Sequence, residues 1–311
     1  MRVLITGGTG TIGRRLGEHL GQYAHTALVV SRQPYRPATL PARIAFARWD
    51  GQTAAGWGQL VEQADAIVNL AGAGIAAARW TNKRKKLIQD SRVKAGQAVV
   101  EAMRAAANRP KVLIQASAVG YYGPHRAEVI TEASGPGQDF LAEVCRAWEA
   151  STEAVEALGV RRVIIRTGVV LDRRGGALPK LLLPFRLFAG GPAGSGRQWI
   201  SWIHYADEVS AIRFLLENEQ THGPFNLTAP DPLTNGQFAK AIGQAMQRPA
   251  FTPAPGFALK LMLGEMATVL LEGQRVAPQR LQELGFQFEF PTAGAALADL
   301  LAVERPRPPS G

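Results

Sequence analysis

The chain has 311 residues, of which 46% are hydrophobic, a content typical of folded globular proteins. This length suits one large core with a smaller appended region. The 35 basic and 25 acidic residues give a formal net charge of +10, which alone would fit nucleic acid, an anionic membrane or an arginine-rich composition. The one dense basic run, Lys83 to Lys86, stands where a helix should begin, so it indicates a solvated helix face. We therefore expect no specific nucleic-acid partner.

Simple sequence features exclude several other classes. The late apolar stretch Pro255 to Leu271 is interrupted by Lys260 and Glu265 and is shorter than the roughly 20 residues that cross a bilayer. We interpret it as a packing helix and expect no membrane partner. The N-terminus leads straight into a strand-like segment without a secretory signal, which predicts a cytoplasmic location. Cys145 is the only cysteine, and no His, Asp or Glu cluster has metal-ligand spacing, so no disulfide and no metal are predicted.

Short apolar runs alternate with helix-length segments in the first half of the chain. Strands are expected at Val3 to Thr6, Ala27 to Ser31, Ile44 to Trp49, Ala66 to Leu70, Val112 to Ala116 and Arg162 to Arg166. Buried parallel strands are nearly continuous in Val, Ile and Leu, and the intervening helices supply the crossovers. The pattern predicts an α/β protein, a doubly wound parallel-sheet Rossmann fold.

The alternation ends after about Gly168, where a Gly/Pro-rich stretch runs to Gly196. Helices are expected at Asp207 to Asn218, Asn235 to Met246, Phe257 to Leu271 and Ala293 to Leu301, with little strand between them. We predict a nucleotide-binding domain over residues 1–170, whose sheet later segments can complete. A smaller, mostly helical C-terminal substrate region is expected over residues 171–305, followed by a disordered tail at 306–311.

A glycine-rich turn follows the first predicted strand and opens the first helix. Gly7, Gly10 and Gly13 recur at three-residue spacing. The first glycine permits the tight turn, the second lets backbone N–H groups approach a pyrophosphate, and the third allows close helix packing. The turn therefore predicts a dinucleotide site formed by Gly7, Thr9, Gly10, Thr11, Ile12 and Gly13.

The end of the second strand distinguishes the two nicotinamide cofactors. An acidic residue there would bind the ribose 2′-OH, whereas an arginine would accept a 2′-phosphate. This chain has Ser31-Arg32 and no acid, and a guanidinium grips phosphate in bidentate fashion, which predicts NADP(H). The alternative is that Arg32 is simply an exposed strand-end residue. Asp50 would either face the adenine edge or begin a turn.

Several motifs together resemble the extended short-chain dehydrogenase/reductases, closest to the atypical branch often labelled NAD-dependent epimerase/dehydratase family proteins. The resemblance covers Met1 to about Leu301 and is carried by Thr6 to Gly13, Asn69 to Gly72, Arg79-Trp80, Ser91-Arg92, Ser117 to Gly123, Phe185-Arg186, Gly190-Gly191, Trp202 to His204 and Leu271 to Val276. It implies NADP(H) at the glycine turn, with Leu70 and Ala71 lining the adenosine-side channel. It further implies that Arg92 takes the place of a helix asparagine and that Val170 lies near the nicotinamide. A helix-surface role is the alternative for Arg92.

The chain departs from this family at its usual catalytic pair. Typical members use a Tyr and a Lys four residues later, because the cation lowers the pKa of the phenol that exchanges a proton with substrate. The segment Phe140 to Glu149 has no such pair and carries Cys145 at the lysine position. This argues against ordinary tyrosine-driven hydride transfer. Cys145, among apolar neighbours, is interpreted as a core residue.

Three hydroxyl groups remain as catalytic candidates. Ser117 would polarise a carbonyl, hydrogen-bond the cofactor amide or merely cap a buried strand. Tyr121 and Tyr122 would donate a proton or merely pack under the substrate loop. We interpret Asp207 as a helix N-cap and expect His204 to satisfy a local hydrogen bond, not to form a catalytic dyad with it.

Two functional hypotheses follow. One is an NADP(H)-dependent oxidoreductase or epimerase-like enzyme acting on a small carbonyl or sugar-like molecule. The other is a non-catalytic NADP(H)-binding redox sensor or partner-binding protein. The substrate side is expected at Gly175 to Gly196 and the C-terminal helices, with a homodimer as a possible assembly. Four arginines are candidates to meet an acidic substrate group: Arg166, Arg186, Arg197 and Arg275.

Overall fold

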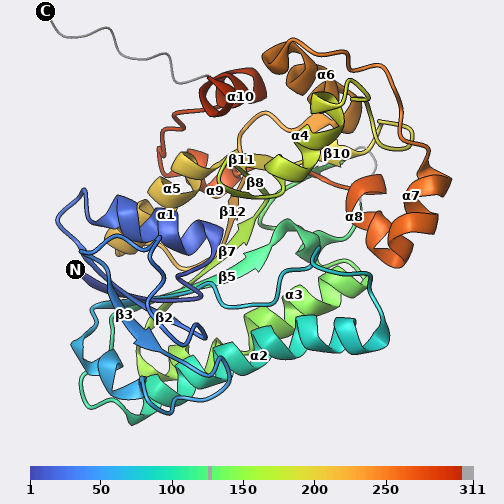
Figure 1. Cartoon of the computed structure of the whole chain (residues 1–311). Coiled ribbons are helices and arrows are strands. Elements are labelled where there is room, and N and C mark those ends of the chain that lie inside the picture. The colour runs from blue at the N-terminus through green and yellow to red at the C-terminus, as the bar shows by residue number, and fades with distance from the viewer. Residues whose placement is uncertain (125–127, 303–311) are drawn as a thin grey trace, which may run out of the picture.

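A seven-stranded parallel sheet forms the centre of the computed structural model, which describes residues 1–124 and 128–302 (Figure 1). The predicted tail at 306–311 lies outside the described residues. The sheet order is β12-β7-β5-β4-β1-β2-β3. Six of its strands confirm the predicted ones: β1 (Arg2–Thr6), β2 (Thr26–Ser31), β3 (Ala45–Arg48), β4 (Ala66–Asn69), β5 (Val112–Ala118) and β7 (Arg161–Thr167). The predicted doubly wound Rossmann fold is thus confirmed.

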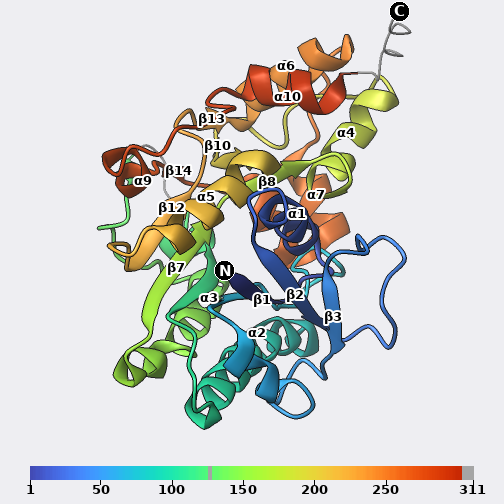
Figure 2. The same cartoon turned by 90° about the vertical axis from the view of Figure 1, so that its left-hand side faces the viewer.

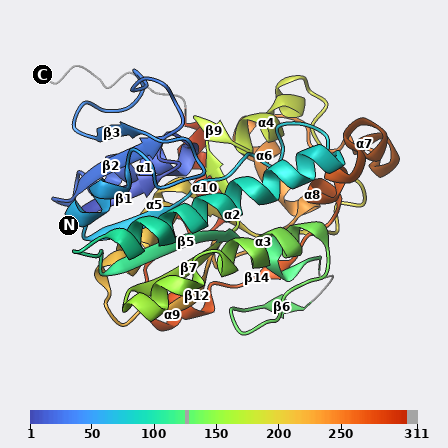
Figure 3. The same cartoon turned by 90° about the horizontal axis from the view of Figure 1, so that it is seen from below.

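Helices cover both faces of the sheet, as Figure 3 shows from below. On one face lie α1 (Thr11–Leu20) and α5 (Tyr205–Glu217), and on the other lie α2 (Asn82–Ala105) and α3 (Phe140–Ala150). Leu16 and Val209 pack with Val29 on the first face, while Val99 packs with Ile67 on the second. All of these side chains are essentially inaccessible, and each contributes about 1.5–3 kcal/mol through burial.

The seventh strand, β12 (Gly223–Leu227), comes from the segment in which little strand was expected. It pairs in parallel with β7, and α5 is the crossover that leads to it. Its sequence, Gly-Pro-Phe-Asn-Leu, lacks the continuous aliphatic run that marks the other strands. Phe225 and Leu227 are its side chains in the hydrophobic core, and Asn226 between them is buried as well.

The C-terminal region has a core of its own, built on α4 (Leu178–Arg186), α6 (Asn235–Met246) and α10 (Ala293–Leu301). Leu182, Phe238 and Leu297 meet in it. Thr234 begins α6 with a reciprocal capping box to Gln237. The smaller elements are β6 (Val129–Ile130), β8 (Val169–Asp172), β9 (Gly175–Gly176), β10 (Trp199–Ile200), β11 (Trp202–His204), β13 (Leu233–Thr234), β14 (Arg275–Val276), α9 (Gln279–Glu283) and the 3-10 helices η1 (Gly58–Gln63), η2 (Val119–Tyr122) and η3 (Glu153–Leu158).

The packing helix expected over Phe257 to Leu271 is wrong in two respects. The segment is divided into α7 (Gly256–Leu263), the 3-10 helix η4 (Gly264–Ala267) and α8 (Thr268–Leu271). Gly264 breaks it because its backbone has φ +62°, which lies outside the helical region. Moreover, Phe257 and Leu261 of α7 are 77% and 78% exposed, so this helix does not bury its apolar residues.

The basic run Lys83 to Lys86 lies in the first turn of α2, as predicted. Thr81 caps this helix by accepting a hydrogen bond from the Arg84 N–H. Lys85 pairs with Glu265 of η4, and Lys86 pairs with Asp90 at 3.4 Å. Among the residues described, no helix is both long and apolar enough to span a membrane.

Candidate functional site: a nucleotide cleft and a buried charged network

The glycine turn between β1 and α1 leaves open space above Gly10. The Gly10 N–H donates to the Gly7 carbonyl at 2.9 Å, and Gly7 has φ +65°. A Cβ at Gly13 would lie 2.4 Å from Gly8 Cα, whereas one at Gly10 would meet only the Gly7 oxygen, at 3.2 Å. Gly7 and Gly13 therefore allow the turn itself. Gly10 instead leaves the uncapped N-terminus of α1 accessible to an anion.

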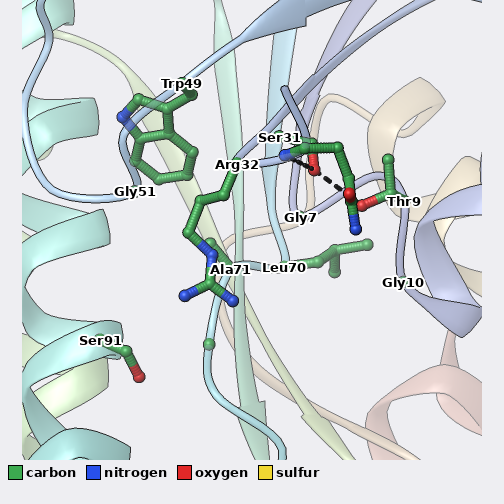
Figure 4. A pocket seen from close by; sticks show the side chains of 12 residues that line it. Gly7, Thr9, Gly10, Ser31, Arg32, Trp49, Gly51, Leu70, Ala71 and Ser91 are labelled. Carbon is green, nitrogen blue, oxygen red and sulfur yellow. Dashed lines mark hydrogen bonds between the residues drawn. The ribbon is translucent and has the colours of Figure 1, made fainter. Parts of the chain in front are cut away.

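A pocket of about 420 Å³ opens beside this turn (Figure 4). It brings together seven of the predicted cofactor residues: Gly7, Thr9, Gly10, Ser31, Arg32, Leu70 and Ala71. Five further lining residues were not predicted from the sequence: Gln33, Trp49, Gly51, Gly72 and Ser91. The sequence signal for Gly51 is a glycine shortly after the β3 strand. In the structure it has φ +83°, and a Cβ there would meet the Arg32 side chain at 2.8 Å.

Two hydroxyl groups, one from the glycine turn and one from the end of β2, lie at the pocket beside the Arg32 guanidinium. Thr9 Oγ1 and Ser31 Oγ lie 2.8 Å apart, and the exposed Arg32 side chain extends across the opening (Figure 4). None of the twelve described residues that line the pocket is acidic. Asp50 does not line it, and instead accepts the Gln52 and Thr53 N–H groups, which confirms the turn interpretation.

The other predicted cofactor residues do not line this pocket. Thr11, Ile12 and Gly13 form the first turn of α1. Val170 lies in β8 beside Ile203 and packs against the core under α1 and α5.

Arg92 anchors the loop that forms one wall of the pocket. Its Nη1 donates to the Ala73 and Ile88 carbonyls, and its guanidinium stacks on Trp148 at 4.8 Å. Desolvation lowers the pKa of Arg92 to about 10. On the preceding residue, Ser91 Oγ accepts the Ala73 N–H at 3.0 Å, so both side chains hold the Gly72-Ala73 segment against α2.

The Ser117 side chain belongs to a buried ionic network and does not face open space. Its Oγ donates to Glu149 Oε1 at 2.6 Å, and Arg166 donates to both oxygens of the same carboxylate, at 2.9 and 3.0 Å. All three residues are buried. Although desolvation opposes it, the hydrogen bonds and attraction of Glu149 raise the pKa of Arg166 above its ordinary value.

The two tyrosines of η2 differ in environment. Tyr122 is fully buried, donates to Asn226 Oδ1 at 2.7 Å and accepts from Arg166, and burial raises its pKa to about 12. Tyr121 is half-buried, and its ring lies 3.5 Å below the Arg166 guanidinium. Of the two phenols, Tyr121 is therefore the one with surface facing solvent.

Helix α3 brings Leu141 and Cys145 against η2. A Cβ on Gly120 would lie 3.3 Å from Leu141 Cβ and 3.9 Å from Cys145 Sγ. Cys145 is buried, as predicted for a core residue, and burial raises the pKa of its thiol to about 11. A neutral thiol and an isobutyl group cannot activate a phenol as an ammonium does.

His204 and Asp207 form no dyad. His204 caps α5 through Nδ1, which accepts the Ala206 N–H at 3.2 Å, so the expected local hydrogen bond is confirmed. The prediction that Asp207 is the N-cap is wrong, because its carboxylate accepts the Glu289 and Phe290 N–H groups from the C-terminal segment.

The four arginines proposed for the substrate lie apart. Arg166 is committed to Glu149, Arg275 stacks on Trp199 at 4.7 Å, and Arg186 lies on α4. Arg197 is exposed in the loop between α4 and β10. In the described part of the chain, no group of three or more His, Cys, Asp or Glu side chains could hold a metal ion.

Comparisons with known proteins agree with this geometry. The model of the NAD dependent epimerase/dehydratase family matches residues 3–228, and that of a domain of unknown function, DUF1731, matches residues 254–300. The chain is 42% identical over 303 residues to the Arabidopsis thaliana protein named Epimerase family protein SDR39U1 homolog, chloroplastic, covering 97% of this chain and 87% of that one. It is 40% identical over 301 residues to a Staphylococcus aureus epimerase family protein, covering 96% and 98%.

A solved structure gives the same picture. The crystal structure of human epimerase family protein SDR39U1 (isoform 2) with NADPH is 37% identical, with a TM-score of 0.87, and covers 97% of this chain and 99% of that chain. Fold and site thus define a Rossmann-type dinucleotide-binding protein. The chain belongs to the NAD dependent epimerase/dehydratase family, and its C-terminal region matches the DUF1731 domain.

Proposed function

We propose that this protein is an NADP(H)-dependent oxidoreductase of the epimerase/dehydratase type that acts on a small carbonyl or sugar-like substrate. The observation that carries the proposal is the non-acidic pocket in which Gly10, Ser31 and Arg32 converge. The open space over Gly10 suits a pyrophosphate, and Arg32 suits a 2′-phosphate, with Thr9 and Ser31 as hydroxyl partners. The human relative crystallised with NADPH supports this choice.

Cofactor selection is tested by calorimetric titration of the protein and two variants with NADPH and NADH. The parent should prefer NADPH by at least about 10-fold, equivalent to about 1.4 kcal/mol. Arg32→Asp should remove or reverse this preference. Arg48→Asp makes the same charge change at an exposed residue of the adjacent strand outside the pocket, and it should keep the preference. Equal affinities in the parent would refute the selection.

For the chemical step, we propose that Tyr121 exchanges the proton with the substrate oxygen. The bound cofactor supplies or accepts the hydride. Ser117 donates its single hydroxyl hydrogen to Glu149, and Tyr122 is fully buried. The ring of Tyr121, in contrast, is half-buried and stacks against the Arg166 guanidinium. The Arg166–Glu149 pair fixes the ring and thereby orients its hydroxyl group.

Tyr121→Phe and Tyr122→Phe form a matched test, because each removes one hydroxyl group from neighbouring residues. With a substrate found by screening carbonyl compounds and sugar nucleotides for NADPH oxidation, Tyr121→Phe should lower the single-turnover rate at least 100-fold, the order of general acid catalysis. Tyr122→Phe should chiefly lower stability, because it removes a buried hydrogen bond. The reverse ranking of the rates would contradict the assignment.

A specific observation favours a second candidate function, a non-catalytic NADP(H)-binding redox sensor or partner-binding protein. The Ser117 hydroxyl donates to the carboxylate of a buried ion pair, and Leu141 and Cys145 of α3 lie against η2, where the family resemblance implies a Tyr/Lys pair. Tight NADPH binding without turnover of any carbonyl or sugar-nucleotide substrate would favour this candidate. The expected cytoplasmic location and homodimer stay predictions, which fractionation and light scattering would test.

A further inference from the structure

A second hollow, separate from the nucleotide pocket, lies among the C-terminal helices. It has a volume of about 900 Å³ and shares no lining residue with the nucleotide pocket. Residues from the ends of α4, α6 and α10 line it, together with the turn after β8. These helices gather at the end of the molecule opposite α2 and α3 (Figures 1 and 2).

Three arginines face this groove: Arg173, Arg186 and Arg248. All three are exposed, and none of the described residues that line the groove is acidic. Within residues 1–124 and 128–302, none of the three guanidinium groups is ion-paired with a carboxylate. The carboxylate next to Arg173 in sequence, Asp172, is held by Arg15 at 2.6 Å. Among the described residues, the three positive charges of the groove thus have no carboxylate partner.

Arg186 lies in the last turn of α4, where its charge is favourable, but hydrogen bonding to helix C-termini does not account for these arginines. Basic side chains that complement a helix C-terminus donate to its last carbonyl groups. Among the described contacts, Arg173 and Arg186 donate to no carbonyl, and Arg248 makes only a long bond to the Gln247 carbonyl, at 3.5 Å. Arg248 instead stacks on Phe188 at 4.4 Å, which holds its guanidinium over an apolar ring.

Apart from Gln247, the rest of the lining is apolar. Leu182 and Leu301 come from α4 and α10, and Met246 comes from the end of α6. Leu182 belongs to the C-terminal core, so this wall of the groove is fixed by packing. Guanidinium groups bind phosphate and carboxylate in bidentate fashion, while an apolar wall gains free energy by covering a hydrocarbon.

We propose that this groove binds an amphipathic organic anion, in which a phosphate or carboxylate group is attached to an apolar body. The three arginines bind the anionic group, and the half-buried Met246 and Leu301 cover the apolar part. The volume lies within the range of small-molecule sites, roughly 300–1,000 Å³. This binding is independent of the nucleotide pocket and of the proposed reaction.

Octyl phosphate, used below its micelle concentration, tests the proposal in protein saturated with NADPH. Inorganic phosphate supplies the charge alone, and octyl glucoside supplies the chain alone. Methyl-labelled methionine provides reporters by NMR, since Met246 lines the groove, Met103 is buried in the sheet core and Met262 lies on the exposed α7 helix. Octyl phosphate should shift the Met246 signal, at a lower concentration than either control ligand.

The triple variant Arg173→Gln, Arg186→Gln, Arg248→Gln should weaken octyl phosphate binding at least about 10-fold while keeping stabilisation by NADPH. Arg104→Gln, at an exposed arginine in the last turn of α2, is the matched control and should change neither. The proposal would be overturned if the Met246 signal did not shift, or if only the Met262 signal shifted. It would also be overturned if octyl glucoside bound equally well, or if the triple variant kept its affinity for octyl phosphate. Equal binding of inorganic phosphate would refute its amphipathic part. Lipid vesicles containing phosphatidic acid then separate a membrane source of the ligand from a free metabolite.

Discussion

The ion pair between Glu149 and Arg166 is predicted to be a main determinant of stability in the region around η2. Glu149→Gln removes the negative charge but keeps the side-chain size, which leaves Arg166 charged in a buried site. The side chains of Arg166 and Glu149 are 5% and 10% exposed. Breaking a buried pair by neutralising one partner costs about 3–5 kcal/mol, and we expect about 3 kcal/mol, because the amide still accepts from Ser117.

Glu156→Gln is the control, because its carboxylate pairs with Arg162 at 2.6 Å, shorter than the 2.9 Å of the buried pair, but is 53% exposed. The Arg162 side chain is 10% exposed, so the pair is only partly exposed, and its loss should cost about 1 kcal/mol, less than that of the buried pair. Urea unfolding of the two variants, followed by circular dichroism, measures both losses. The double variant Glu149→Gln, Arg166→Gln should lose less than the sum of the single losses, because no buried charge is left alone. A loss below about 1 kcal/mol for Glu149→Gln would refute the assignment of an energetically coupled network.

Three further predictions concern the cofactor turn, the core and the network. Gly10→Val should leave a folded protein that NADPH no longer stabilises in thermal melts, because the new side chain meets little protein but fills the pyrophosphate space. A melting temperature that NADPH still raises would contradict this. Burial raises the pKa of Glu208 to about 8 from 4.5, so the native state retains a proton that the unfolded state releases. The free energy of unfolding should therefore fall as pH rises from 4.5 to 8. Urea titrations at several pH values should show a smaller fall for Glu208→Gln, whereas an equal dependence of the unfolding free energy on pH would count against the raised pKa. Ser117→Ala should lower any single-turnover rate about 10-fold through Glu149, and Cys145→Ala should leave it unchanged; the opposite order would overturn both roles.

Much of the sheet follows from local sequence, because six strands are apolar runs bounded by turn residues. β12 escaped prediction because Gly223 and Pro224 begin it, and only its pairing with β7 makes it a strand. The division of the Phe257 to Leu271 segment depends on the positive φ of Gly264, which hydrophobic periodicity does not reveal.

The cofactor turn could be predicted for the same reason that it functions, since its glycines are required by backbone geometry. The network of Ser117, Glu149 and Arg166 could not, because its members are distant in sequence and meet only when β5, α3 and β7 pack together. Asp207 was misassigned because a helix-start position suggests a cap, while the carboxylate is satisfied by N–H groups some 80 residues later, at Glu289 and Phe290.

A crystal structure of the protein with NADPH would show whether the cofactor binds as proposed. We expect the pyrophosphate over Gly10, the 2′-phosphate within hydrogen-bond reach of Arg32, and the Tyr121 hydroxyl on the substrate side of the nicotinamide. A 2′-phosphate bound away from Arg32, or NADPH bound outside the pocket beside Gly10, would contradict it.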